Sequence, residues 1–327
     1  MSTLSPLPAS HDRTPAESRE PAIAVLIPCY NEEIAIASVV ADFRAALPMA
    51  TIYVYDNNSR DRTAEVARAA GAVVGRELLQ GKGNVIRRMF ADVEADIFVL
   101  VDGDATYEAA SAPEMVRLLQ DQRLDMVNGT RVSAIEAAYR PGHRLGNVVL
   151  TGIVRTIFGN RITDMLSGYR VFSRRFVKSF PALSGGFETE TEFTVHALEL
   201  GMPIGEIETP YRERPPGSQS KLNTVGDGIR ILLTIVRLVK EERPLQFFSL
   251  SGLVLLAVAV ILGIPLVTEF ARSGTVPRFP TAILATGLVG LAFLSFTCGL
   301  ILDSVSRGRT EVKRLAYLSV PLFPREP

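Results

Sequence analysis

The sequence has 327 residues, with 35 basic and 35 acidic side chains and two cysteines. The balanced charge provides no global field that would favour nucleic acid, so we expect no nucleic-acid partner. Cys29 and Cys298 are far apart, and no cluster of Cys and His has the spacing of a zinc site. The length allows one large domain with an appendage, or two modest domains.

The N-terminal segment differs in composition from the rest of the chain. Residues 1–20 are rich in Ser, Pro, Ala and charged residues and lack the apolar region of a signal peptide. We expect a disordered tail here and a soluble α/β domain over residues 21–225.

Apolar runs and helical patterns alternate through this domain. Strands are predicted at 23–27, 51–55, 71–74, 97–101 and 126–128. Strands that alternate with helices predict a doubly wound, mostly parallel sheet with flanking helices. No GxGxxG follows the first strand and no GxxxxGK[ST] is present, which disfavours a dinucleotide-dependent dehydrogenase and a P-loop NTPase.

Polar residues gather just after the strands. Asn31 is predicted to cap a helix whose first turn holds Glu32 and Glu33. Asp56 ends the second strand, where an acid can bind a base or ribose hydroxyls. Lys82 lies between two glycines at the start of a helix, so it either contacts a phosphate or is a solvated loop residue.

The strand at 97–101 ends in two acids, Asp102 and Asp104, separated by a glycine. Two carboxylates at this spacing suit a hard divalent cation that also holds phosphates. The competing interpretation is an ordinary solvated turn, because Asp and Gly are common turn residues.

Other residues that could carry chemistry have simpler interpretations. His143 and His196 are expected to be structural or surface residues, because no nucleophile motif accompanies them, and Cys29 is expected to be a packing residue. Glu188 and Glu190 open a helical stretch, so they either favour its N-terminus or reach a donor sugar or acceptor.

The C-terminal part has the composition of a membrane anchor. Residues 247–267 and 281–302 are uncharged spans of transmembrane length, and we expect a transmembrane hairpin over 246–303. Lys and Arg concentrate outside the pair, which predicts a multi-pass protein of the inner (cytoplasmic) membrane with the domain, both termini and a tail at 304–327 in the cytoplasm. Buried helices of a soluble protein are the alternative. Residues 226–245 read as an interfacial amphipathic helix or as a plain core helix.

A series of motifs occurs in order along residues 22–225. These are Pro28-Cys-Tyr-Asn-Glu-Glu33, Asp56-Asn-Asn-Ser-Arg-Asp-Arg-Thr63, Asp102-Gly-Asp104, Asn128-Gly-Thr-Arg131, Asp164-Met-Leu-Ser-Gly-Tyr-Arg170 and Tyr211-Arg-Glu-Arg-Pro-Pro-Gly-Ser-Gln-Ser-Lys221. The series resembles family 2 inverting glycosyltransferases of the dolichyl-phosphate mannose synthase type, whose bacterial relatives act on undecaprenyl phosphate.

The resemblance implies a GT-A fold and transfer of one sugar, with inversion, from a UDP- or GDP-sugar to polyprenyl phosphate at the cytoplasmic membrane face. Asp102 and Asp104 would hold Mg²⁺ or Mn²⁺. The expected catalytic residues are Asp164, Asp104 and Arg131. The other residues expected to bind substrate are Pro28, Tyr30, Glu32, Asp56, Lys82, Asp102, Arg170, Glu190, Arg212, Arg214, Ser220 and Lys221.

Two departures from the family pattern affect these expectations. Asn57 stands where many members have a second Asp, and Pro215-Pro216 adds a proline to the basic loop. Members with this layout also include homotetramers. A processive polysaccharide synthase is disfavoured, because the chain has one hairpin and lacks the QxxRW signature. A non-catalytic membrane scaffold is disfavoured because Asp102, Asp104, Asp164 and Arg131 are intact.

Overall fold

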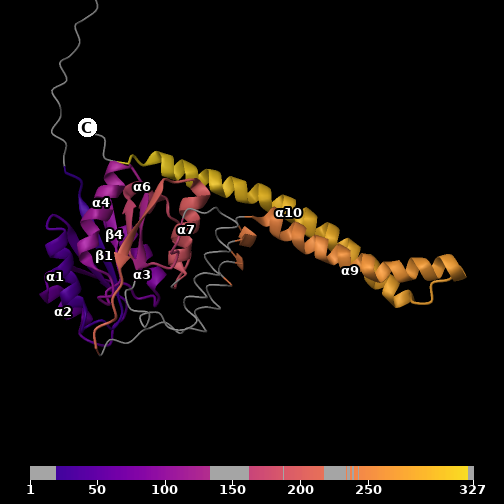
Figure 1. The fold of residues 1–327 in the computed structure, drawn as a ribbon, viewed down its shortest axis with the longest axis horizontal. Helices are drawn as coiled ribbons and strands as arrows, with labels where there is room; N and C mark the ends of the chain where they lie inside the picture. Colours follow the sequence, from indigo (N-terminus) through magenta and orange to yellow (C-terminus); the bar gives the residue numbers. More distant parts are fainter. Residues whose placement is uncertain are drawn as a thin grey trace, which may run out of the picture.

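The computed structural model describes residues 20–132, 162–186, 188–216 and 243–322, with residues 233, 236–237 and 239–241 between the last two ranges. They form an α/β domain from which two long helices project as an antiparallel pair (Figure 1). Two predicted segments fall mostly outside these residues. They are the N-terminal tail (residues 1–20), of which only residue 20 is described, and the amphipathic helix (residues 226–245).

The elements follow the predicted alternation. The strands are β1 (Ile23–Cys29), β2 (Thr51–Asp56), β3 (Val73–Arg76), β4 (Ile97–Leu100), β5 (Met126–Val132), β6 (Arg170–Ser173) and β7 (Ile204–Pro210). The helices are α1 (Ile36–Ala46), α2 (Thr63–Ala69), α3 (Lys82–Asp92), the short 3₁₀ helix η1 (Ala109–Ser111), α4 (Ala112–Asp121), α6 (Arg174–Ser179), α7 (Thr189–Leu200), α9 (Pro244–Ser273) and α10 (Phe279–Ser319).

The strands form a seven-stranded sheet in the order β3-β2-β1-β4-β6-β5-β7. β1 is parallel to β2 and β4, and β5 is parallel to β7. β6 lies antiparallel between β4 and β5, so β5 runs in the direction of β4. The prediction of a mostly parallel sheet is therefore confirmed, and β1, β2, β4 and β5 all end at one edge of it.

Alternate side chains of each strand enter opposite cores, as the two-residue period of a strand requires. In β4, Phe98 and Leu100 pack with residues of α3, α6 and α7, whereas Ile97 and Val99 pack with residues of α1, α2 and α4. The sheet is thus covered on both faces, which explains why its central strands read as continuous apolar runs.

The predicted helix cap at Asn31 is wrong. α1 begins at Ile36 after Ala35, and its first turn holds no acidic residue. Asn31 has a φ of 53°, and its Oδ1 accepts a hydrogen bond of 2.7 Å from the backbone N–H of Arg60. Asn adopts this left-handed conformation more readily than most residues, so Asn31 turns the chain after β1 and joins it to the loop after β2.

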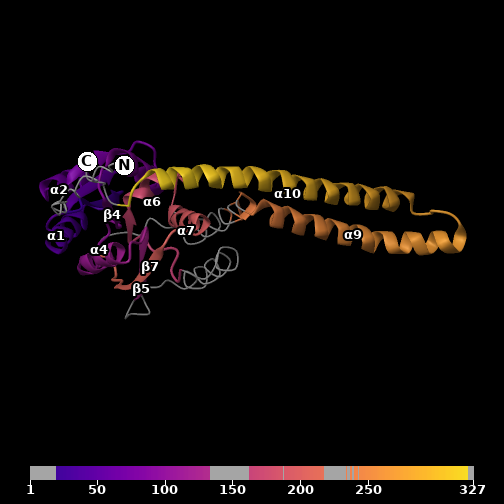
Figure 2. The same cartoon turned by 90° about the horizontal axis from the view of Figure 1, so that it is seen from above.

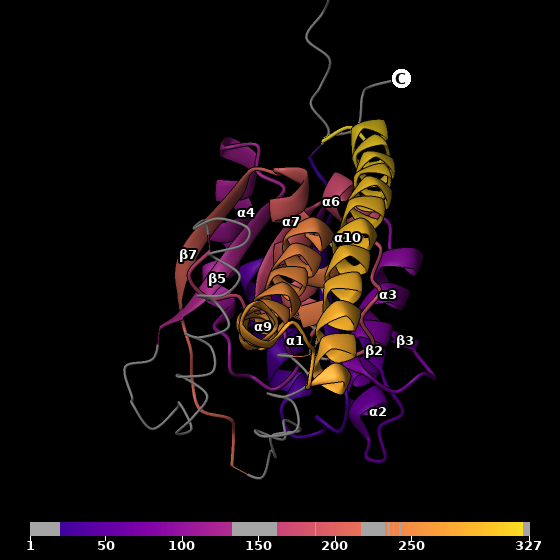
Figure 3. The ribbon, with the colours of Figure 1, turned by 90° about the vertical axis from the view of Figure 1, so that its right-hand side faces the viewer.

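α9 and α10 are long and apolar enough to cross a membrane, and they lie side by side as a candidate hairpin (Figures 1 and 2). Only 11% of the most apolar window of each helix is buried. The alternative of buried helices in a soluble protein is therefore wrong. In the view along the pair, β5 and β7 lie to one side of it and β2 and β3 to the other (Figure 3).

α10 does not end at the predicted membrane boundary near residue 303. It continues to Ser319 and lies along α6 and α7 (Figures 1 and 2). Glu199 of α7 accepts hydrogen bonds from Thr310 at 2.6 Å and Lys313 at 2.7 Å, and Tyr317 donates to Asp125 at 2.8 Å. Most of the predicted C-terminal tail (residues 304–327) is thus a helix docked on the domain.

Candidate active site

The sequence-predicted site residues collect at the edge where the parallel strands end. Asp56 is the last residue of β2, Asp102 and Asp104 follow β4, and Arg131 lies next to the end of β5. Ligands of open α/β sheets bind at this edge, because loops and helix N-termini converge there.

Lys82 joins two acids that are distant in sequence. It is the first residue of α3, and its Nζ lies 2.5 Å from Asp102 Oδ1 and also pairs with Glu190 Oε1. Burial alone would favour the neutral amine, but the two carboxylates reverse that effect and raise the pKa of Lys82. The side chain is only 9% exposed, so the alternative of a solvated loop lysine is wrong.

Glu190, in α7 (Thr189–Leu200), is the second acid that contacts Lys82. It lies in the first turn of α7, as the sequence predicted, and it is buried. Its Oε2 has no hydrogen-bond partner among the described residues. Glu190 therefore places a negative charge at the N-terminus of α7, which such a charge stabilises. It also brings a carboxylate to Asp102 and Asp104, which are called the acid pair below.

Asp104 is held by a second cation. Its Oδ2 lies 2.5 Å from Arg214, and its Oδ1 accepts hydrogen bonds from Thr106, with the hydroxyl at 2.6 Å. Arg214 also lies 3.8 Å from Glu32. Burial and the charge of Asp102 raise the pKa of Asp104, although Arg214 and Thr106 oppose this. Arg212, in contrast, is mostly exposed and pairs with Glu108.

Two glycines permit the close packing around the acid pair. A Cβ at Gly168 would lie 2.5 Å from Asp102 Oδ2, so glycine lets the loop after Asp164 approach this carboxylate. A Cβ at Gly103 would lie 2.5 Å from Cys29 Sγ. Cys29 itself is buried, and burial together with the surrounding acids raises its pKa well above its usual value. Cys29 is thus a packing residue, as predicted.

The donor set around the acid pair fits a metal that binds together with a ligand. No group of three or more His, Cys, Asp or Glu side chains arranged for a metal ion occurs among the described residues. Asp102 and Asp104 offer two hard carboxylates, and Mg²⁺ typically takes one or two carboxylates plus phosphate and water oxygens. These residues therefore fit a divalent ion that is completed by a diphosphate.

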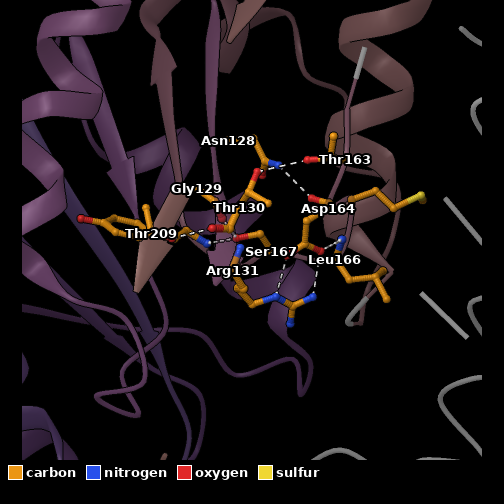
Figure 4. Close-up of polar contacts among 12 residues, drawn as sticks. Asn128, Gly129, Thr130, Arg131, Thr163, Asp164, Leu166, Ser167 and Thr209 are labelled. Carbon is orange, nitrogen blue, oxygen red and sulfur yellow. Dashed lines mark hydrogen bonds and ion pairs between the residues drawn. The ribbon is translucent and has the colours of Figure 1, made fainter. Parts of the chain in front are cut away.

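Asp164 and Arg131 form a second centre (Figure 4). Arg131 Nε donates to Asp164 Oδ2 at 2.7 Å and a terminal nitrogen donates to Oδ1 at 2.8 Å, which is a bidentate arrangement. Although burial opposes its charge, contact with Tyr107 and Asp164 raises the pKa of Arg131. The bidentate contact thus fixes the direction of the Asp164 carboxylate.

The nucleotide side of the predicted site lies at the ends of β1 and β2. Asp56 is buried, and its carboxylate accepts hydrogen bonds of 3.2 and 3.4 Å from the N–H of Ser59. Pro28 is in β1, with Tyr30 just beyond it, and both are half-buried. Glu32 is buried nearby, and its N–H donates to Thr63 at 2.8 Å.

Asn57 has a role that sequence reasoning missed. Its amide nitrogen donates to the carbonyls of Glu77 and Leu79 at 2.9 and 2.8 Å, and its oxygen accepts from Gly81 N–H at 2.7 Å. An ionised Asp could not make the first two bonds, because it has no donor. Asn57 thereby holds the loop that leads into Lys82, which accounts for the departure from the family pattern.

Arg170, expected to bind substrate, lies behind the site. It is fully buried, and it donates to the carbonyls of Met165 and Ser167 at 2.7 and 3.1 Å and to Thr194 at 3.0 Å. In this structure it supports the loop that carries Asp164, and direct contact with a substrate stays a prediction.

The remaining expectations are resolved in part. His196 is buried against Phe176 and Phe180, and burial, reinforced by Lys313, lowers its pKa to about 4, as suits a structural histidine. Ser220, Lys221 and His143 lie outside the described residues.

Comparison with known proteins identifies the family. The chain is 33% identical over 305 residues to glycosyltransferase AglJ of Haloferax volcanii, which covers 91% of this chain and 98% of that protein. The family model described as glycosyl transferase family 2 matches residues 24–180. The chain belongs to glycosyl transferase family 2. Since the AglJ match covers nearly the whole chain, the likeness extends beyond the catalytic domain into the hairpin.

Two further proteins resemble this glycosyltransferase. It is 29% identical over 221 residues to a dolichyl-phosphate hexose transferase of H. volcanii, covering 68% of this chain and 95% of that protein. Glucosyl-3-phosphoglycerate synthase of Mycobacterium tuberculosis, solved with Mn²⁺, UDP and phosphoglyceric acid, matches with a TM-score of 0.56 at 23% identity. That match covers 66% of this chain and 78% of the solved chain, and it supports the GT-A fold.

Proposed function

We propose that this glycosyltransferase moves a single sugar, with inversion, from a nucleotide-diphospho-sugar to the phosphate of a polyprenyl phosphate at the cytoplasmic face of the inner membrane. One observation carries the proposal. The acid pair Asp102 and Asp104 lies in a domain to which the second helix of the apolar hairpin is directly docked. The relative named dolichyl-phosphate hexose transferase supports a lipid phosphate acceptor.

The donor would bind across the ends of β1, β2 and β4. We assign the nucleoside to Pro28, Tyr30, Glu32 and Asp56, and the diphosphate to the acid pair. Mg²⁺ or Mn²⁺ held by Asp102 and Asp104 would neutralise the negative charge that builds on the departing diphosphate. Lys82 now neutralises Asp102 and is a cation that the diphosphate oxygens can recruit.

The acceptor chemistry requires little help from a base. A polyprenyl phosphate is already an anion near neutral pH, so no strong general base has to remove a proton from it. We assign Asp164 the task of orienting the acceptor or the donor sugar, because its carboxylate is fixed by Arg131. Arg212, Arg214, Ser220 and Lys221 are the residues we propose for the lipid phosphate, where cations would offset the repulsion between two phosphates.

The membrane orientation follows from the hairpin. β1, the first strand, and the C-terminal end of α10 both lie at the end of the molecule opposite the turn between α9 and α10 (Figure 1). Basic residues concentrate on that same side, including Arg307, Arg309, Lys313 and Arg314. The positive-inside rule then puts the domain in the cytoplasm. The homotetramer stays a prediction.

A direct assay tests the proposal. The full chain, reconstituted in phosphatidylglycerol-containing liposomes with undecaprenyl phosphate and Mn²⁺, is supplied in turn with radiolabelled UDP-glucose, UDP-N-acetylglucosamine and GDP-mannose. We expect one donor to place label in a lipid that mild acid hydrolyses. Label in a polymer instead would indicate a processive synthase, and no label from any donor would favour the scaffold interpretation.

A further inference from the structure

A carboxylate on the outer strand of the sheet contacts the residue just before Asp164. Glu206 lies in β7, where it is the direct register partner of Asn128 in β5. Its Oε1 accepts hydrogen bonds from the N–H of Thr163 at 2.9 Å and from Asn128 Nδ2 at 2.9 Å, and its Oε2 accepts from the Thr163 hydroxyl at 2.8 Å. Glu206 therefore binds both polar groups with which Thr163 can donate.

Asn128 extends this contact to the other side of Asp164. The same Nδ2 that donates to Glu206 also donates to the backbone carbonyl of Asp164 at 2.8 Å. Both partners are acceptors, so the amide can serve them only with its nitrogen facing them. Asn128 is fully buried, and Figure 4 shows it beside Thr163 and Asp164. The peptide group before Thr163 is therefore tied to Glu206 of β7, and the peptide group after Asp164 is tied to Asn128 of β5.

These ties complement the contact that fixes the side chain of Asp164. Arg131 sets the direction of the carboxylate, but a bidentate pair alone could shift as a unit with the loop. The bonds of Glu206 and Asn128 fix where the loop begins, and Ser167 fixes it further along by donating to the Gly129 carbonyl at 2.5 Å. Hydrogen bonds to an ionised carboxylate are stronger than those between neutral groups.

We infer that Glu206 is a positioning residue for catalysis, which acts by clamping the Thr163 end of the loop so that the Asp164 carboxylate is held at the reacting centre. This inference rests on the proposed function of Asp164. No sequence pattern indicates this role, because Glu206 lies outside every recognised motif and in a strand that was not predicted.

The chain offers a matched control in the same strand. Glu208 lies two residues further along β7, on the same face, and it is exposed. Glu208→Gln and Glu208→Ala make the same chemical changes as Glu206→Gln and Glu206→Ala without touching Thr163 or Asn128.

The first test does not require activity. Hydrogen–deuterium exchange of the full chain in nanodiscs should show faster exchange over residues 162–168 in Glu206→Ala, with exchange in β1 and β4 and the melting temperature unchanged. Glu206→Gln, which keeps one acceptor oxygen, should fall between Glu206→Ala and the wild type. Unchanged exchange in Glu206→Ala, or faster exchange throughout the sheet, would overturn the inference.

The second test is kinetic. With the liposome assay, Glu206→Ala should lower kcat by about 10- to 100-fold while the KM for the donor stays within about twofold, because a displaced catalytic group weakens the transition state more than the ground state. Glu206→Gln should recover part of the loss, and both Glu208 variants should match the wild type. Normal kcat in Glu206→Ala would overturn the inference. Failure of the wild type to transfer sugar would contradict the proposed function. The hydrogen–deuterium exchange experiment alone would then test whether Glu206 holds the loop in place.

Discussion

The acid pair and Asp164 lie at the same edge of the sheet but are held in opposite ways. Asp102 and Asp104 each pair with a different cation, Lys82 and Arg214, which come from separate parts of the chain. Asp164 pairs through both oxygens with one guanidinium, and its backbone is tied to β5. Under the proposed function, the acid pair would exchange its cations for a metal and a diphosphate, whereas Asp164 would keep one orientation throughout.

The largest effect should come from removing a carboxylate of the exchangeable pair. Asp104→Asn should lower metal-dependent turnover by on the order of 10²- to 10³-fold, since the metal ion whose positive charge offsets the leaving group would lose a carboxylate ligand. Initial rates across a Mn²⁺ titration measure this. Asp121→Asn, at an exposed helix end, is the control. Near-wild-type rates with an intact fold would show that Asp104 is not part of a metal site.

The fixed centre should be sensitive to geometry rather than to charge. Arg131→Lys keeps a cation beside Asp164 but cannot reproduce the bidentate contact, so kcat should fall by about 10²-fold. Arg62→Lys makes the same change at the exposed pair with Glu33 and should leave kcat unaltered. A normal kcat in Arg131→Lys would mean that the direction of the Asp164 carboxylate is unimportant, and the contrast between the two centres would then fail.

Lys82 provides a test of whether a metal ion can replace the cations that now pair with the acid pair. If its ammonium group competes with a metal for Asp102, Lys82→Met should tighten Mn²⁺ binding in the absence of nucleotide by about tenfold, equivalent to about 1.4 kcal/mol. Electron paramagnetic resonance of free Mn²⁺ measures the affinity without turnover. Lys178→Met, at a lysine that pairs with Glu94, is the matched control. Unchanged or weaker binding would remove the argument for competition.

The smallest effects are expected at the two arginines of the basic loop, Arg212 and Arg214, and the two variants should differ in size of effect. Arg214→Gln removes the partner of Asp104, so kcat/KM for the lipid acceptor should fall by about tenfold, with a smaller change for the donor. Arg212 is mostly exposed, so solvent would screen its contact with the lipid phosphate, and Arg212→Gln should change the same constant by less than about fivefold. Equal losses toward donor and acceptor in Arg214→Gln would place this residue elsewhere in the reaction.

The sequence predicted β1 to β5 but missed β6 and β7. Runs such as Ile97–Leu100 are apolar on both faces because helices cover both sides of the sheet, and this makes them easy to recognise. β6 has four residues and begins with Arg170. β7 is half-buried over its first four residues, contains two glutamates and ends in Pro210. Neither pattern differs enough from a loop to be recognised without knowledge of the strands it joins.

The site could be predicted in its parts but not in its pairings. Asp102 and Asp104 were predicted because they follow a strand, and Arg131 and Asp164 because they match motifs of the family. The contact of Lys82 with Glu190 joins residues 108 positions apart, and no local pattern reports such a contact. The error at Asn31 has a related cause. A side chain that suits a helix cap also suits a left-handed turn, and the distant Arg60 N–H decides between them.

Because α10 is uninterrupted, its number of residues fixes its length. At about 1.5 Å per residue, its 41 residues span about 60 Å, of which a bilayer core takes about 30 Å. In the proposed membrane orientation, the remainder would link the membrane surface to Glu199 and Asp125 without a flexible joint. The number of residues between Leu302 and Tyr317 would then set the height of the sheet edge above the lipid headgroups. Each added residue there would raise the domain by about 1.5 Å and rotate it by about 100° about the helix axis.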